Sequence, residues 1–517
     1  MGVPACLLQA GARRQVAPTH LGMLPEMNVL KILLPGLFMA QIIATIQICL
    51  SNAGLYRAFT AMREAGYLVV PNQHVAHHLK EFAHAFWGGL FFTLTVGAGL
   101  SVLTLAAVWT WDRVFCRSRT FLILLLLFWM GCLLWVHSHG FCPAATSYFI
   151  FVPAVVLAAA LKWMPAQPRQ RTRFGEFAPV IPLPLLALLW LPLASGDVFL
   201  DIRDNLLLSN SFGTKISNFY YSYTLYPAEA FKSLDQKMLR TCSIEGIKED
   251  FTAKLLEKRL LDHDYLNIRR YPKADLKIME EGGMLAFKNR GKTILRIARG
   301  DFLAAPGDVL KEFSLKSDRH SLFRKFTFFC LLTGFPLILY ITLYALFYLV
   351  SCIFMDSQKS SVAASILCFA IGALILSSLY FAGRKTIDAD NLSETMESGH
   401  WRERVVALKV VGRKGMEIGD FRAYKKMLKS PYMPERYWLA KAMSKSRKPE
   451  TYSELLALLD DPNRNVVCMA FSALGERKNP GAAGEIIKRI ETSGDWYIQQ
   501  YAYRALRRLG WKQTGSK

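Results

Sequence analysis

The sequence lacks the short motifs that mark most common cofactor and catalytic sites. No GxGxxG, P-loop, HExxH or GxSxG pattern occurs in its 517 residues, so the corresponding dinucleotide, phosphate, zinc-protease and hydrolase sites are not indicated. The ten cysteines form no CxxC or CxxCH, which argues against a zinc ribbon and against covalently attached c-type haem. Catalytic residues therefore stay unknown from the sequence.

Charge is scarce in seven long apolar stretches. The chain is 52% hydrophobic and has a mean hydropathy of +0.21, which is more apolar than a soluble protein of this length. Each stretch is close to the ~20 residues that cross ~30 Å of hydrocarbon. Their near lack of ionisable residues argues against a proton-coupled pump. We expect spans at about 28–50, 86–111, 120–138, 147–164, 178–195, 326–354 and 362–382.

Lysine and arginine in the short loops predict the orientation. The loops Arg113–Arg119 and Lys162–Arg173 are basic, and basic short loops stay in the cytoplasm. The N-terminus is then cytoplasmic, and residues 51–85 are outside. The apolar run after Lys31 is too long for a typical signal peptide and predicts a retained anchor. We expect a multi-pass protein of the bacterial inner (cytoplasmic) membrane.

The stretch 178–195 decides the side of everything that follows. It contains four prolines and is either a span or a re-entrant segment. A span places residues 196–325 and the C-terminal tail outside, whereas a re-entrant segment places both in the cytoplasm. Basic residues beside the last two spans, such as Arg324 and Arg384, favour the cytoplasm.

Residues 196–325 predict a small α+β unit. Apolar residues at helical spacing indicate a helix over 251–261, and the region 276–297 reads as strand, turn and strand around Asn289–Gly291. The tyrosine-rich stretch 218–226 suits a membrane interface, where amphipathic rings gather. A platform for a lipid or a carbohydrate is the alternative.

The tail repeats itself. The segment Ala470–Gly475 (AFSALG) recurs at 502–506 (AYRAL), a shift of 32 residues. Upstream, 404–410 and 436–442 lie at nearly the same period, and Asp461–Pro462 is expected to cap a helix start.

These repeats resemble the short bacterial HEAT-like repeats that are related to phycobilisome-lyase repeats, over about 392–511. The resemblance implies an α-solenoid that binds other proteins, in which each repeat buries its apolar face against its neighbours.

The expected fold is therefore mainly α: a polytopic helical membrane domain of about seven spans, a small inserted α+β domain and a C-terminal α-solenoid of HEAT-like repeats. The expected order is an N-terminal tail (1–27), a membrane domain (28–195), a soluble domain (196–325), a two-span hairpin (326–382) and the repeats (383–517).

Histidines concentrate near one predicted membrane face. On a continuous helix His77, Glu81 and His84 would share one side, and imidazoles with a carboxylate can hold zinc or another divalent metal. His84 and His137 end neighbouring spans, and two facing imidazoles can ligate haem b. The simpler alternative is that these histidines only occupy a polar boundary.

The combined features predict a membrane-anchored scaffold or regulatory protein. Its partners would be proteins bound through residues 392–511 and membrane lipids. The net charge of +23 is explained by cytoplasmic loops and anionic headgroups, and no motif indicates specific nucleic-acid binding. The alternatives are a membrane redox or metal protein that uses the histidines, and a lipid or glycan transferase that uses Asp201, Arg203 and Asp204.

Overall fold

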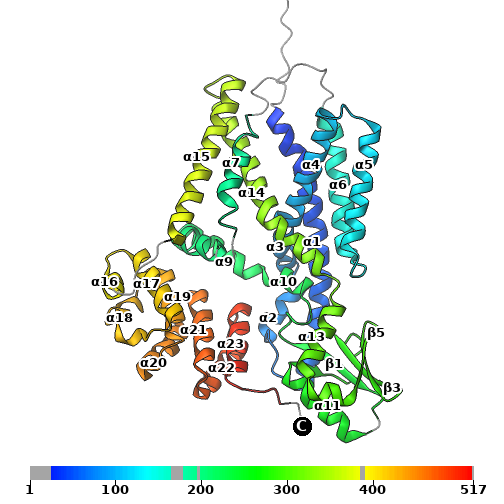
Figure 1. Cartoon of the computed structure of the whole chain (residues 1–517), viewed down its shortest axis with the longest axis vertical. Coiled ribbons are helices and arrows are strands. Elements are labelled where there is room, and N and C mark those ends of the chain that lie inside the picture. The colour runs from blue at the N-terminus through cyan, green and yellow to red at the C-terminus, as the bar shows by residue number, and fades with distance from the viewer. Residues whose placement is uncertain are drawn as a thin grey trace, which may run out of the picture.

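The computed structural model describes residues 25–164, 178–194, 198–247, 249–269, 271–384 and 391–514. Within them the chain is mainly helical and has three parts (Figure 1). Long helices form a layer in the upper half of the view, and a small sheet unit and an array of short helices lie below it. The two lower parts therefore lie at the same end of the helical layer.

Within the described ranges, six helices are long and apolar enough to cross a membrane, by length and composition. Many of their apolar side chains face outward, and in the helix over Arg119–Val136 only 11% of the most apolar window is buried. Such a surface fits lipid better than water. The helices are α1 (Pro25–Glu64), the continuous stretch of α3 (Phe82–Phe92), η2 (Thr93–Gly97) and α4 (Ala98–Arg113), then α5 (Arg119–Val136), α6 (Pro143–Trp163), α14 (Ser321–Ser351) and α15 (Ser357–Arg384).

The expected helical span at 178–195 is wrong in form. Only α7 (Pro182–Trp190) is helical there, because the prolines of this stretch lack the backbone donors that a longer helix needs. Its nine residues rise about 13 Å, which is less than the ~30 Å of the hydrocarbon layer. The segment still runs inside the layer, antiparallel to α14. The Trp190 indole donates to the Leu332 carbonyl at 2.9 Å, and the Tyr340 hydroxyl donates to the Pro179 carbonyl at 2.7 Å. The chain then leaves the layer through α8 (Val198–Ile202) and η4 (Arg203–Leu207).

Two helices follow at the lower edge of the layer. They are α9 (Ser211–Tyr223), which begins at the side-chain cap of Asn210, and α10 (Leu225–Phe231). In Figure 1, α9 lies across the lower end of the long helices rather than along them. The tyrosine-rich stretch therefore lies at the boundary between the layer and the lower parts.

The sheet unit confirms the predicted helix and hairpin. The helix is α11 (Asp250–Asp262), and β4 (Met284–Asn289) and β5 (Lys292–Ala298) are antiparallel across the turn. The sequence missed β1 (Arg240–Glu245) and β2 (Tyr265–Asn267), a parallel pair that α11 connects. With β3 (Leu276–Glu281) the strand order is β2-β1-β3-β4-β5. The helices α12 (Arg299–Ala304) and α13 (Pro306–Ser317) complete the unit and contribute Phe302 and Phe313 to its core.

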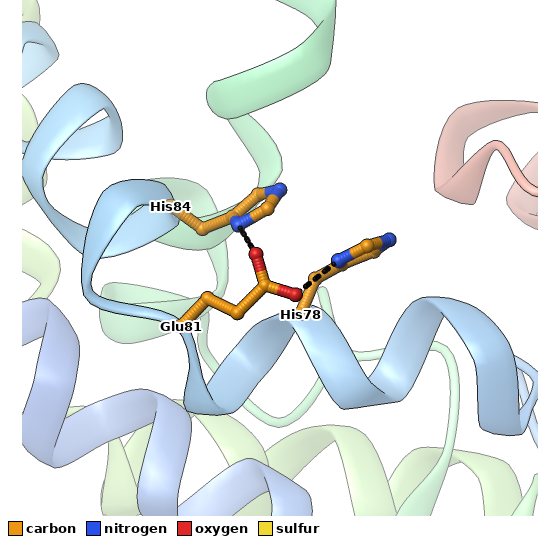
Figure 2. Close-up of side chains that lie close together, drawn as sticks. All are labelled: His78, Glu81 and His84. Carbon is orange, nitrogen blue, oxygen red and sulfur yellow. Dashed lines mark hydrogen bonds and ion pairs between the residues drawn. The ribbon is translucent and has the colours of Figure 1, made fainter.

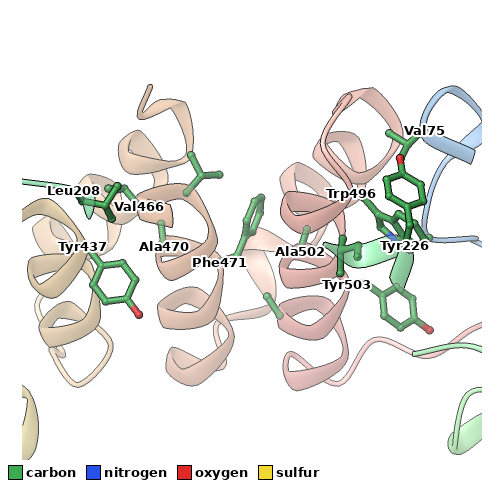
Figure 3. Packing of buried hydrophobic residues seen from close by; sticks show 14 of the residues in the cluster. Val75, Leu208, Tyr226, Tyr437, Val466, Ala470, Phe471, Trp496, Ala502 and Tyr503 are labelled. Carbon is green, nitrogen blue, oxygen red and sulfur yellow. The ribbon is translucent and has the colours of Figure 1, made fainter. Parts of the chain in front are cut away.

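The C-terminal array stacks helix pairs, as the repeats predict. Ala470 and Ala502, which the 32-residue shift relates, are both fully buried in adjacent second helices. Figure 3 shows Phe471 between those two helices, and Trp496 on the far side of the last one, beside Tyr226. The pairs are α16 (Leu392–Glu397) with α17 (Trp401–Lys414), α18 (Tyr424–Met427) with α19 (Met433–Met443), α20 (Pro449–Ala457) with α21 (Arg464–Arg477), and α22 (Ala483–Thr492) with α23 (Trp496–Arg508).

An ion-pair ladder connects successive repeats. An arginine near the start of α17, α19 and α21 pairs with a carboxylate of the next repeat: Arg404 with Glu435, Arg436 with Asp461 and Arg464 with Asp495.

The expected cap at Asp461 is wrong, because the N-cap of α21 is Asn463. Asp461 instead accepts from the Asn463 amide at 2.8 Å and from Arg436 at 2.6 Å. It therefore joins two repeats and does not begin a helix.

The array also docks on the loop that follows α1. The Asn72 amide donates to Gln499 at 2.8 Å, and its side chain donates to the Ser493 carbonyl at 2.9 Å. Residues 51–85 and the array therefore share one end of the layer. This contact favours the alternative in which 178–195 spans the membrane and the tail lies on the same side as 51–85.

Replacing Leu474 with Asp should unfold the array. Leu474 is fully buried in α21, and an unpaired buried carboxylate costs several kcal/mol. Hydrogen exchange of the purified full chain should show lost protection across 391–514, while the long helices stay protected. The control is Ser472→Asp, which changes a half-buried residue of the same helix. Unchanged protection in Leu474→Asp would contradict the packing.

Candidate functional site

Three side chains near the start of α3 converge on one point. The helix α2 (Gln73–His77) gives way to the 3-10 helix η1 (His78–Lys80), and Glu81 is extended before α3. Nδ1 of His78 lies 2.8 Å from one Glu81 carboxylate oxygen, and Nδ1 of His84 lies 3.0 Å from the other. Figure 2 shows both rings turned toward that carboxylate. The ligand atoms of the three residues lie within 4.8 Å of one another.

The structure brings His78 into this cluster and leaves His77 out. His77 is exposed and is not among the three grouped residues. The sequence-based grouping, with Glu81 four residues and His84 seven residues after His77, assumed a continuous α-helix. The helix instead ends at His77. In the 3-10 turn that follows, residues three apart share a face, which selects His78 and Glu81. Recognising a 3-10 turn would have been needed to find His78 from the sequence.

The cluster has the chemistry of a divalent-metal site. Two ligands of a tetrahedral zinc ion lie about 3.3 Å apart when each is about 2.05 Å from the metal, and the three ligand atoms here lie within 4.8 Å of one another. The hydrogen bond with His78 lowers the pKa of Glu81, so that carboxylate stays ionised. The Tyr223 and Tyr226 rings lie 5.5 and 5.1 Å from the His84 ring and wall the cluster on one side.

The two histidines of the predicted haem pair, His84 and His137, have different neighbours. His137 is bonded at both ring nitrogens, accepting from the Cys142 amide at 3.2 Å and contacting the Thr146 hydroxyl at 2.9 Å. It caps α5, which packs on α4 and α6, whereas His84 belongs to α3, which packs on α1, α9 and α10. The two histidines therefore have separate neighbourhoods, and haem ligation by them stays a prediction.

The proposed transferase residues hold the array against the layer. Arg203 and Asp204 form a buried ion pair at 2.7 Å. The other Asp204 oxygen accepts from the Trp438 indole at 2.8 Å, and the Arg203 guanidinium lies 3.9 Å above the Tyr437 ring. These groups join η4 to α19, so their partners are already within the chain.

The first two repeats carry a basic edge that the sequence analysis missed. All its side chains are exposed, and no ion pair with a described residue involves them. It lies on and beside α17 and α18, at one end of the array, whereas α23 lies at the other end (Figure 1). The positive charge of residues 413–429 is visible in the sequence, but their position at one end of the array is not. The basic edge consists of Arg413, Lys414, Arg422, Lys425, Lys426 and Lys429.

Comparison with protein families identifies HEAT repeats at residues 422–510. This match covers the last three helix pairs and confirms HEAT-like repeats in the C-terminal region, without extending to the phycobilisome-lyase type. Neither the search of curated proteins nor that of solved structures finds a match.

The cluster predicts zinc binding by His78, Glu81 and His84 but not by His77. The full chain, purified in detergent and loaded with zinc, should hold about one ion per chain by elemental analysis. His78→Ala and His84→Ala should each weaken binding by more than about tenfold, and the adjacent His77→Ala is the matched control. Acid should release the metal, because protons compete for the imidazoles. Equal loss in His77→Ala would contradict the assignment.

Proposed function

We propose that this protein is a membrane-anchored scaffold whose HEAT repeats bind a protein partner. HEAT repeats generally mediate protein–protein interactions, and the match at 422–510 carries the proposal. The apolar helices support the anchoring, since six are long enough to cross a bilayer. As a more specific part of this proposal, the repeats are of the phycobilisome-lyase type.

The free part of the array favours an acidic partner. Residues 391–514 contain 23 lysines and arginines against 14 aspartates and glutamates. Internal ion pairs neutralise much of that charge, as in the pair of Arg436 with Asp461. The basic edge has no such partner among the described residues. Because complementary charge steers association and selects partners, an acidic protein surface is the occupant that this edge fits.

The repeats also use part of their surface internally. Second helices of the pairs contact the lower edge of the layer, through Trp438 on Asp204 and through Tyr497, whose hydroxyl lies 3.0 Å from that of Thr224. Among the first helices, α18 and α20 lie on the side away from this contact (Figure 1), whereas the end of α22 contacts Asn72. The partner surface is therefore proposed on the basic edge and on α18.

We infer an inner-membrane location with the array and the sheet unit on the outer side. Two features support this. The basic loop Arg113–Arg119 follows a helix that rises away from the array, and Lys162 lies in the last turn of another such helix, α6; basic short loops stay in the cytoplasm. The rest of the predicted loop Lys162–Arg173, from residue 165 on, lies outside the described residues. Arg324, which favoured the opposite side, is engaged by Asp318 and by the Phe231 carbonyl, so it has a structural role.

A metal site at His78, Glu81 and His84 is the second candidate function. The grouping of three ligand atoms within 4.8 Å supports it. Its position beside α10 gives the metal a structural role, since α10 also contacts the array through Tyr226 and Trp496, whose rings are 5.4 Å apart.

Impermeant thiol labelling of whole cells tests the orientation. In a variant with every other cysteine replaced, the exposed native Cys116 should stay unlabelled from outside, because it lies in a basic loop. Lys426→Cys in the otherwise cysteine-free chain should be labelled. Labelling of both sites after permeabilisation is the accessibility control. Labelling of Cys116 alone from outside would reverse the orientation.

Photo-crosslinking in cells tests the partner surface. A photoreactive amino acid at position 429 should give a discrete adduct, and mass spectrometry should identify a protein with an acidic surface. Adding Lys425→Glu and Lys426→Glu should lower its yield several-fold, because repulsion replaces steering. The control Lys478→Glu with Lys488→Glu makes the same charge change elsewhere in the array and should leave the yield of the adduct unchanged. Equal loss in both variants would contradict the basic edge.

A further inference from the structure

A cavity of about 780 Å³ lies where the helical layer meets both lower parts. Its walls come from α3, the junction of α9 and α10, the start of β1, the lower part of α14 and the last array helix, α23. Residues from three separate parts of the chain therefore line it, and it stays open to the surface. Its volume is in the range of small-molecule sites, about 300–1,000 Å³.

The end of the cavity that faces the layer is apolar. It is lined by Phe91 and Phe92 of the α3 stretch, by Phe231 of α10 and by Phe328 and Leu331 of α14. Phe328 is 53% exposed and lies on a helix that continues up through the layer (Figure 1). The cavity wall is thus continuous with the apolar surface of the layer.

The end that faces the lower parts is cationic, and some of its cations are already neutralised. Lys237 pairs with Asp275 at 2.6 Å, and Arg507 pairs with Asp264 at 3.1 Å. Lys232 and Arg324 likewise pair with neighbouring carboxylates. These four hold the walls together.

Three further arginines of the lining have no close carboxylate. Arg240 donates to backbone carbonyls, at 2.8 Å to His263 and 2.9 Å to Asp235. Arg504 is exposed and forms no ion pair with a described residue. Arg508 is also exposed; it donates to the Ser472 hydroxyl at 3.3 Å and lies 3.9 Å from Glu476. The lining therefore carries positive charge in excess of its two carboxylates, Asp235 and Asp264.

We propose that this cavity binds an anionic phospholipid, with the phosphate at the arginines and the start of an acyl chain along the phenylalanines. Guanidinium groups match phosphate oxygens in geometry and charge, and the apolar end explains why a lipid fits better than a free anion. Arg504 and Arg508 lie on α23, so the bound lipid bridges the layer and the HEAT array. The docking of the array then depends on lipid composition.

Binding of fluorescent phosphatidylglycerol to the detergent-purified full chain tests the proposal. Phosphatidylglycerol should bind and zwitterionic phosphatidylcholine should not. Arg504→Gln with Arg508→Gln should weaken binding about tenfold, as loss of charged hydrogen bonds does. Both side chains are exposed, so the chain should still fold. Lys478→Gln with Lys488→Gln removes the same charge from array residues that do not line the cavity, and should leave binding unchanged.

Two further arms separate a lipid from a soluble anion. Leu331→Trp narrows the apolar end without changing charge and should also weaken lipid binding. Glycerol phosphate, which lacks the chains, should compete far less well than the lipid at equal concentration. Equal binding of both lipids, equal competition by glycerol phosphate, or equal loss in the lysine control would each overturn the proposal.

Discussion

The buried contact between η4 and α19 sets how the parts of this protein are arranged. Asp204 is 1% exposed and Arg203 8%, and burying two charges is costly unless their hydrogen bonds are satisfied. Asp204 meets that condition by accepting from Arg203 on one oxygen and from Trp438 on the other. Loss of Trp438 would leave a buried carboxylate short of a donor, so the array and the layer are held in one orientation.

That orientation explains why the C-terminal repeats contact so much of the chain. From η4 the contact continues along the tyrosine-rich stretch, where the Tyr221 and Tyr497 rings are 5.0 Å apart. It reaches the sheet unit through Tyr503, which donates to Asp264 at 2.7 Å. Burial raises the pKa of Asp264, and Tyr503 and Arg507 supply the bonds that keep its position. The array is therefore in contact with both the layer and the sheet unit.

The histidine cluster illustrates the limit of reading sites from spacing. The sequence contained the right residue types within a few positions of one another, but a spacing rule is valid only for one helix geometry. The change from α to 3-10 at His78 comes a few residues after Asn72, which binds the array, and the residue types do not announce it. His84 and His137 have different neighbours in the structure, so their spacing along the chain alone does not place them together.

The sequence by itself determined the apolar helices, the hairpin around Asn289–Gly291 and the repeat period, because each depends on local pattern: unbroken apolar length, turn residues and recurrence every 32 positions. It also contained the prolines that shorten α7. Only the tertiary structure decided which surfaces of the array are free, which arginines are paired and that 51–85 contacts the tail. Those features depend on contacts between residues hundreds of positions apart, such as Asp204 with Trp438 and Asn72 with Gln499, which no local pattern encodes.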